Sequence, residues 1–282
     1  MSKYIYTHTT CINKYFFKKL FVILILICTY KHSSSQQLNN WVFPDFNGIT
    51  FNTNPISFIS GGQITTLNNG FSTSSISDRN GNLLFYSDGQ RVWNKNNAVM
   101  PNGTGLLGIA GQINTALIVP FINDSSKYYL FVSWGSGNNI LNNPSQYQYS
   151  YNIVNMQLNG GLGDVINKNI FIQFYATENM VAVPNANGND IWWVCRDWTN
   201  HFYSYKITCT GFQNSSPVIS TVGNDINNNP SLLGAGDIKS SSDGKFICVS
   251  YGAYFEIYRF NASTGVLSNP VLIPFSNSNR FG

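Results

Sequence analysis

The feature that most constrains this chain is a short strand–turn–strand pattern that recurs along its length. The segment "ISDRNGNLLFYSDGQRVWNKN" (76–96) places glycine-containing turns between short aromatic strands. Asn-Gly and Asp-Gly supply the positive φ that tight hairpin turns require. Similar units, each with an apolar strand, a polar turn and a second strand, follow at 116–134, 180–207 and 237–275. Aligned on their turns, they lie about 45–65 residues apart.

This recurrence predicts a β-propeller, because repeats of about 40–55 residues with four strands each are typical of propeller blades. "DIWWVCRDW" (190–198) and "KFICVSY" (245–251) are apolar nearly throughout, which predicts strands covered on both faces. "YFEIYRF" (254–260) alternates, so we expect one wetter face there. "NMQLNGGLGDV" (155–165) is predicted to be a turn, and no amphipathic helix longer than two turns is expected.

We therefore expect an all-β propeller of about four four-stranded antiparallel blades, at 71–108, 113–175, 178–223 and 234–275. The segment 41–62 is expected to supply one or two outer strands of a blade that closes the ring. Closed propellers have four to eight blades. Two interpretations stay open: an incomplete propeller from a truncated or partial product, which we favour, and a four-bladed ring closed by 41–62.

The N-terminus predicts an export signal covering residues 1–35. A basic stretch ends at Lys19, an apolar run of about eleven residues follows, and small serines precede the expected cleavage between Ser35 and Gln36. The run is shorter than the roughly 20 apolar residues of a membrane span. We expect an exported protein, secreted or at the cell surface, with no span after cleavage; an uncleaved anchor is the alternative.

The charge balance argues against a nucleic-acid partner. The formal net charge is +4, but five of the 16 basic residues precede Gln36, so that 11 remain against all 12 acidic residues. No basic stripe is left to neutralise phosphates.

No catalytic residue, metal or cofactor is predicted. His201 is the only histidine after the predicted signal, and it is expected in a solvated turn where Asp197 is within hydrogen-bonding reach. No G-x-S-x-G motif accompanies the pair. Most other carboxylates sit in turns, where they are expected to cap their own backbone: Asp78, Asp88, Asp124, Asp190, Asp225 and Asp243.

Trp134 and Trp198 are the candidate ligand-contacting aromatics, because each lies near a turn rich in Gly or Asn. The other tryptophans of the repeats are expected to pack between blades. Three cysteines follow the predicted signal: Cys195, Cys209 and Cys248. They are interpreted as buried strand residues, with a Cys195–Cys209 bond across a hairpin as the alternative.

Several segments in combination also carry a family resemblance: "LNNWVFPDFNGITFN" (38–52), 76–108, "ALIVPF" (116–121), 155–165 and "STGVLSNPVLIPF" (263–275). Together they resemble the N-terminal propeller of large secreted surface proteins of gliding bacteria. Those proteins belong to the WD40/YVTN-repeat-like, quinoprotein amine dehydrogenase β-chain-like superfamily. The resemblance covers 38–282 and departs at 58–75. It implies export, a surface role, and in such proteins further blades, adhesion modules and a type IX secretion signal; it implies no catalytic residues.

The expected function is a non-catalytic binding or scaffold module that contacts protein or glycan through loops on one face. The alternatives are a lactonase-like hydrolase with a site in the propeller channel, and a truncated non-functional remnant. Open blade edges would also favour self-association.

Overall fold

The computed structural model describes residues 37–60, 62–63, 73–108, 116–134, 147–226, 236–251 and 254–274. Contacts divide the chain into two units, Met1–Ser35 and Gln36–Gly282, and every described residue belongs to the second. The predicted signal and its cleavage site therefore lie outside the described residues. None of the residues in these ranges forms a helix long and apolar enough to cross a membrane.

The described chain folds into five antiparallel sheets, and its one helical turn is η3 (Asn159–Gly161). Two sheets have three strands: β1 (Asn40–Phe43), β2 (Asn47–Thr50), β3 (Ser57–Ser60), and then β4 (Ser74–Ser77), β5 (Leu83–Ser87), β6 (Val92–Asn94). Three have four strands: β7 (Ala116–Pro120), β8 (Lys127–Trp134), β9 (Gln148–Asn155), β10 (Asp164–Phe174); β11 (Ala176–Pro184), β12 (Ile191–Asp197), β13 (His201–Thr208), β14 (Gly211–Thr221); and β15 (Ile238–Ser240), β16 (Phe246–Tyr251), β17 (Tyr254–Asn261), β18 (Val266–Pro274).

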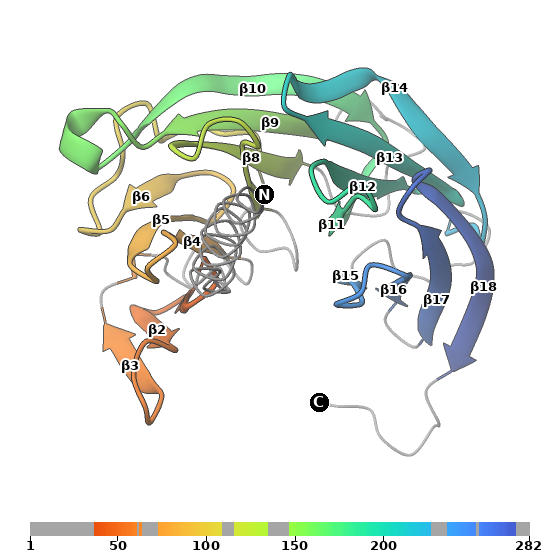
Figure 1. The fold of residues 1–282 in the computed structure, drawn as a ribbon, viewed down its shortest axis with the longest axis horizontal. Helices are drawn as coiled ribbons and strands as arrows, with labels where there is room; N and C mark the ends of the chain where they lie inside the picture. Colours follow the sequence, from red (N-terminus) through yellow and green to blue (C-terminus); the bar gives the residue numbers. More distant parts are fainter. Residues whose placement is uncertain are drawn as a thin grey trace, which may run out of the picture. The chain divides into compact units, whose positions relative to one another are not determined.

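Each sheet is a meander whose strands pair in chain order (Figure 1). Successive sheets meet through their first strands: β1 contacts β4, β4 contacts β7, β7 contacts β11, and β11 contacts β15. A common inner position for the first strand of every unit is the arrangement of propeller blades. The prediction of an all-β partial propeller of antiparallel sheets is confirmed, but the described residues form five sheets rather than about four, and the first two have three strands each. Residues 155–165 are a turn around η3, as expected.

The apolar core lies between the sheets, in four layers. We call the face that a sheet turns toward the preceding sheet its leading face, and the opposite one its trailing face. In β12, Trp193 points to the leading side and stacks on Phe131 of the third sheet, with ring centroids 4.7 Å apart. Trp192 points to the trailing side and joins the core shared with the fifth sheet. This confirms that "DIWWVCRDW" is apolar because both of its faces are covered.

Two local predictions need correction. Residues 41–62 contain three strands, not one or two, and β1 packs beside β4; a role in closing a ring stays a prediction. In β16, Ile247, Val249 and Tyr251 are buried, whereas Phe246 on the trailing side is exposed. No sheet of the described residues packs on this trailing side, where Cys248 is only partly buried. The alternation predicted for β17 is confirmed.

Candidate functional site

The ends of two hairpins from the third and fourth sheets lie together. Trp134 ends β8 and pairs with Gln148, the first residue of β9. Tyr147, one residue earlier, meets the Trp198 ring edge-on at 6.2 Å between centroids. Trp198 lies in the turn that joins β12 to β13. We call this region, residues 134, 147–149 and 196–203, the hairpin edge.

The two predicted ligand-contacting tryptophans differ in their surroundings. The Trp134 residue is 40% exposed at the end of its strand. Trp198 is partly buried, packs against the core between the fourth and fifth sheets, and donates its indole N–H to the Ala176 carbonyl at 2.8 Å. Trp198 therefore has a structural role that accounts for its position, whereas Trp134 presents its ring to solvent. Ligand contact by either one remains a prediction.

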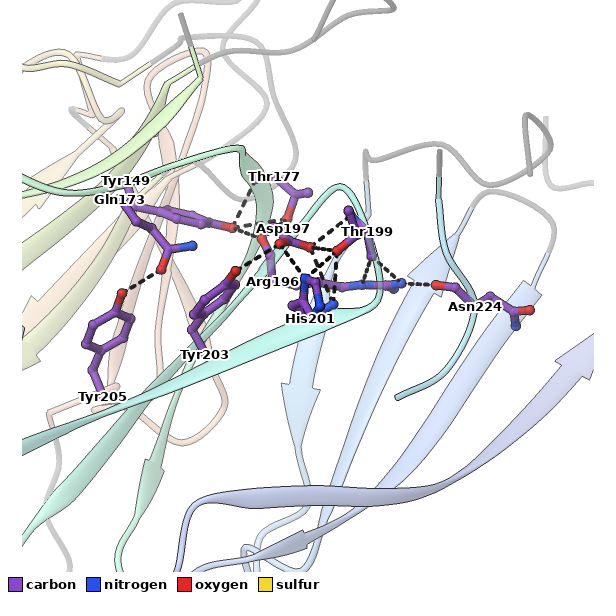
Figure 2. Close-up of polar contacts among 10 residues, drawn as sticks. All are labelled: Tyr149, Gln173, Thr177, Arg196, Asp197, Thr199, His201, Tyr203, Tyr205 and Asn224. Carbon is purple, nitrogen blue, oxygen red and sulfur yellow. Dashed lines mark hydrogen bonds and ion pairs between the residues drawn. The ribbon is translucent and has the colours of Figure 1, made fainter. Parts of the chain in front are cut away.

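The carboxylate of Asp197 is buried, and three side chains make polar contacts with it (Figure 2). The Thr199 hydroxyl donates to Oδ1 at 2.5 Å, and the Tyr203 hydroxyl donates to Oδ2 at 3.0 Å. His201 Nδ1 lies 3.1 Å from Oδ2, so Asp197 and His201 form the hydrogen bond that their spacing in the sequence allows. Burial and this carboxylate raise the pKa of Tyr203, so its phenol stays a donor.

This geometry assigns the proton of the neutral His201 ring. The Thr199 hydrogen is directed at Asp197, so the Thr199 oxygen, 2.7 Å from Nδ1, acts as an acceptor there. Nδ1 faces two acceptors and must carry the proton, which leaves Nε2 with the lone pair. The His201 side chain is 37% exposed. The residue is the first of β13, and does not lie within the turn as expected. It can therefore offer a hydrogen-bond acceptor or a base to a bound molecule.

Arg196 is a buried charge that sequence reasoning missed. Nε and Nη2 donate to the Thr199 carbonyl at 3.2 and 3.0 Å, and Nη2 also donates to the Asn224 carbonyl. Its guanidinium carbon lies 4.9 Å from the Tyr251 ring centroid. Burial lowers the pKa of Arg196, opposed by nearby acidic groups such as Glu256. Among the described residues, Nη1 has no hydrogen-bond partner.

Glu256 is the buried counter-charge, and it reaches Arg196 through a shared neighbour. Its carboxylate accepts from the backbone and side-chain amides of Asn224 at 3.3 and 3.1 Å, and from the Tyr258 hydroxyl at 2.5 Å. Asn224 therefore links the two charges, since its carbonyl accepts from Arg196. One feature of the sequence indicates that Glu256 is buried. In "YFEIYRF", the alternation places Glu256 on the same strand face as Tyr258 and Phe260, and a charged residue is unusual on such an apolar face.

An irregularity in the inner strand β11 lies directly beside this network. Ala176 pairs with Asp197 and Met180 pairs with Cys195, so three residues of β11 stand opposite Arg196 alone. The buried Tyr149 hydroxyl fixes this bulge: it lies 3.0 Å from the Thr177 hydroxyl, 2.9 Å from the Arg196 carbonyl, and accepts from the Thr177 amide at 3.1 Å. Bulges of this kind re-aim side chains beside functional sites.

The turn carboxylates behave largely as predicted. Four of them accept backbone amide hydrogens from residues two to four positions ahead: Asp78, Asp88, Asp124 and Asp243. Asp190 instead accepts from the Asn187 side chain and lies 3.6 Å from the Lys206 ammonium. Within the described ranges, no three His, Cys, Asp or Glu side chains lie together as metal ligands would.

All three cysteines of the described repeats are free, so the Cys195–Cys209 alternative is wrong. Cys195 pairs with Tyr203 in the middle of the β12–β13 hairpin, whereas Cys209 lies beyond the far end of β13 and is exposed. The part of β13 that follows Tyr203 therefore separates them along the strand, and the interpretation as a buried strand residue is wrong for Cys209.

Comparison with known proteins adds no family assignment. No family model matches the chain, and no curated protein matches it. Solved structures that resemble it include a protein provisionally named a 6-phosphogluconolactonase from Bacteroides uniformis, at 11% identity and a TM-score of 0.39, covering 81% of this chain and 65% of that one. An exo-β-1,3-galactanase from Phanerochaete chrysosporium has 12% identity and a TM-score of 0.38, with 82% and 50% covered. The Nup133 β-propeller domain of Vanderwaltozyma polyspora has 11% identity and a TM-score of 0.25, with 76% and 68% covered. The chain thus spans less than two thirds of the first two proteins.

Proposed function

We propose that this chain is an exported, non-catalytic binding module of the WD40/YVTN-like propeller type, which contacts glycan or protein through the hairpin edge. The observation that carries the proposal is that the hairpin edge presents both an exposed indole and a fixed hydrogen-bonding group. Trp134 is 40% exposed, and His201 is oriented by the buried Asp197. Ligand sites commonly combine aromatic surface with a few placed polar groups.

The physical roles of the two groups are different. An exposed indole offers a flat apolar surface on which the C–H face of a sugar, or an apolar side chain, can stack. His201 offers Nε2 as an acceptor for a hydroxyl or amide of a ligand. The surrounding hydrogen bonds hold the ring before binding, so little conformational entropy is lost there.

The test is a binding screen of the purified full chain against glycan and peptide panels, followed by titration of each hit. Trp134→Ala is expected to weaken binding by about tenfold or more, as for a buried aromatic anchor. Phe171→Ala is the matched control, because Phe171 is a 43% exposed aromatic on the outer strand β10 of the same sheet. Absence of any ligand, or equal binding by the Trp134 and Phe171 variants, would refute the proposal.

A lactonase-like hydrolase is the second candidate, and one observation favours it. A histidine whose Nδ1 is held by a buried carboxylate can act as a general base at Nε2. If this candidate is correct, the full chain hydrolyses members of an ester and lactone panel, and His201→Gln abolishes that turnover while leaving the thermal midpoint within a few degrees. Lack of turnover by the unmodified chain would exclude it.

A further inference from the structure

The repeated sheets provide an internal comparison for the residues around His201. The end of the second strand can be aligned in the second to fifth sheets by the face to which each residue points: "FYSD" (85–88), "FVSW" (131–134), "VCRD" (194–197) and "CVSY" (248–251). The first residue of each segment faces the trailing side, as Phe131 and Val194 do, and the third faces the same side because side chains alternate along a strand. That third residue is a serine in three of the four segments, whereas the fourth sheet has Arg196.

The inner strand of the fourth sheet departs from the repeat at the same place. In the third and fifth sheets, β7 and β15 pair with the second strand without an irregularity. In the fourth sheet, three residues of β11 stand opposite Arg196, and all three are buried: Thr177, Glu178 and Asn179. The third and fifth sheets show that a sheet of this type forms without an arginine or a bulge at this place. Their coincidence at Arg196 indicates a role beyond the packing of the sheet.

The guanidinium of Arg196 and the ring of His201 contact the same residue, Thr199 (Figure 2). Arg196 Nε and Nη2 donate to the Thr199 carbonyl at 3.2 and 3.0 Å. The Thr199 hydroxyl donates to Asp197 Oδ1 at 2.5 Å and lies 2.7 Å from His201 Nδ1. Thr199 is therefore held at its carbonyl by the arginine and at its hydroxyl by the aspartate, and the His201 ring meets the oxygen that these contacts place.

The guanidinium itself has little freedom to move. Arg196 is fully buried, and its guanidinium carbon lies 5.1 Å from the Phe202 ring centroid and 4.9 Å from that of Tyr251. Nη2 also donates to the Asn224 carbonyl. A planar guanidinium can direct two N–H groups to one carbonyl while it stacks on aromatic rings. The serine of the other sheets offers a single short hydroxyl and cannot make this set of contacts.

We propose that Arg196 is a positioning residue for His201. By fixing the Thr199 carbonyl, it keeps the Thr199 hydroxyl and Asp197 in place as the two acceptors that hold the ring proton on Nδ1, so that Nε2 keeps its lone pair for a ligand. Arg196 acts through Thr199 and touches no ligand in this role. The use of Nε2 in binding rests on the function proposed above, but the tautomer of the ring does not, and it can be measured without a ligand.

The experiment measures the ratio of the two neutral His201 tautomers by nitrogen-15 NMR on the full chain labelled at histidine. Spectra are recorded at about pH 9, where histidine rings are neutral, and the His201→Gln spectrum identifies the His201 signals among those of the three histidines. The unmodified chain is expected to show the Nδ1-protonated tautomer in excess. Arg196→Ser installs the residue of the other sheets. It is expected to lower the ratio of the Nδ1-protonated to the Nε2-protonated form by about fivefold, the factor that one ordinary internal hydrogen bond contributes.

Val249→Ala is the matched control for a general loosening of the structure. Val249 is buried in the same core between the fourth and fifth sheets, so its truncation is expected to lower the thermal midpoint and to leave the tautomer ratio unchanged. An unchanged ratio in Arg196→Ser, or an equal change in Val249→Ala, would overturn the proposal. If Arg196→Ser does not fold, Arg196→Lys carries the test, because it keeps the charge but not the planar fork. A folded Arg196→Lys chain with the ratio of the unmodified chain would overturn the proposal as well.

The result does not depend on the binding screen. Failure of the screen would refute the proposed function and leave the tautomer ratio unaffected. An unchanged ratio would refute the role of Arg196 even where a ligand binds.

Discussion

Tyr149→Phe removes one oxygen from the buried network that fixes the β11 bulge. The ring keeps its edge-on contact with Trp193, at 5.4 Å between centroids. The Thr177 amide loses its acceptor, and the acceptors around the hydroxyl, including the Arg196 carbonyl, lose a donor. Thr177 is buried, so water does not replace the missing partner in the folded state.

The magnitude follows from those two losses. A typical internal hydrogen bond contributes about 0.5–1.5 kcal/mol, and an unsatisfied buried donor costs about 1–3 kcal/mol. We therefore expect a loss of roughly 2–3 kcal/mol in the free energy of unfolding. For a domain of this size that corresponds to a fall in the thermal midpoint of about 5–10 °C.

Urea unfolding followed by tryptophan fluorescence measures this loss. Tyr175→Phe is the control, because Tyr175 is 45% exposed and its variant should unfold like the parent. Burial raises the pKa of Tyr149 well above its ordinary value, so the hydroxyl stays protonated and the loss should be the same at every pH from neutral to mildly alkaline. A loss below about 0.5 kcal/mol would refute the assignment of Tyr149 as the anchor of the bulge.

Three further predictions concern other parts of the domain. Arg196→Lys keeps the charge but loses the planar fork on the Thr199 carbonyl, and should lower the free energy of unfolding by about 2–4 kcal/mol; a loss under about 1 kcal/mol would contradict a structural role. The Ser126 hydroxyl and Lys127 hold the pKa of Asp124 at about 2. This folded pKa lies below the unfolded one, so the stabilisation is present above about pH 4 and is lost as the pH falls through about 2. Thermal midpoints of the parent and of Asp124→Asn should therefore differ at neutral pH and converge near pH 2; a constant gap would rule this out. Maleimide labelling followed by mass spectrometry should modify the exposed Cys209 first and the buried Cys195 only after denaturation; early labelling of Cys195 would contradict its packing.

Much of the fold was predictable because its signals are local. A turn such as Ser-Asp-Gly before Phe246 is encoded by neighbouring residues, and so is the strand alternation of "YFEIYRF". The hydrogen bond between Asp197 and His201 was predictable for the same reason, since both residues flank one short turn. Trp134 was singled out by its position beside a polar turn, and it is exposed.

The remainder of the site depends on contacts between sheets. Arg196 and Glu256 belong to different sheets, and Asn224 brings them into one network. Nothing near Arg196 in the sequence indicates a buried guanidinium, because two of the groups that stabilise its charge, the Asn224 carbonyl and Glu256, are distant in the chain. The prediction that sheets cover both faces of "KFICVSY" was wrong for a similar reason. Composition indicates that a face is apolar, but it does not indicate whether another sheet packs on it.

The sequence by itself determined the strands, their turns and the repeating sheet, because backbone conformation and hydrophobic alternation are set within a few residues. Only the tertiary structure decided which charged groups are buried together, that Cys195 and Cys209 stay apart, and which strand faces the described sheets cover. Those outcomes depend on the stacking of sheets, in which residues far apart in the chain become neighbours and the free energy of burying each group depends on the partner that it meets.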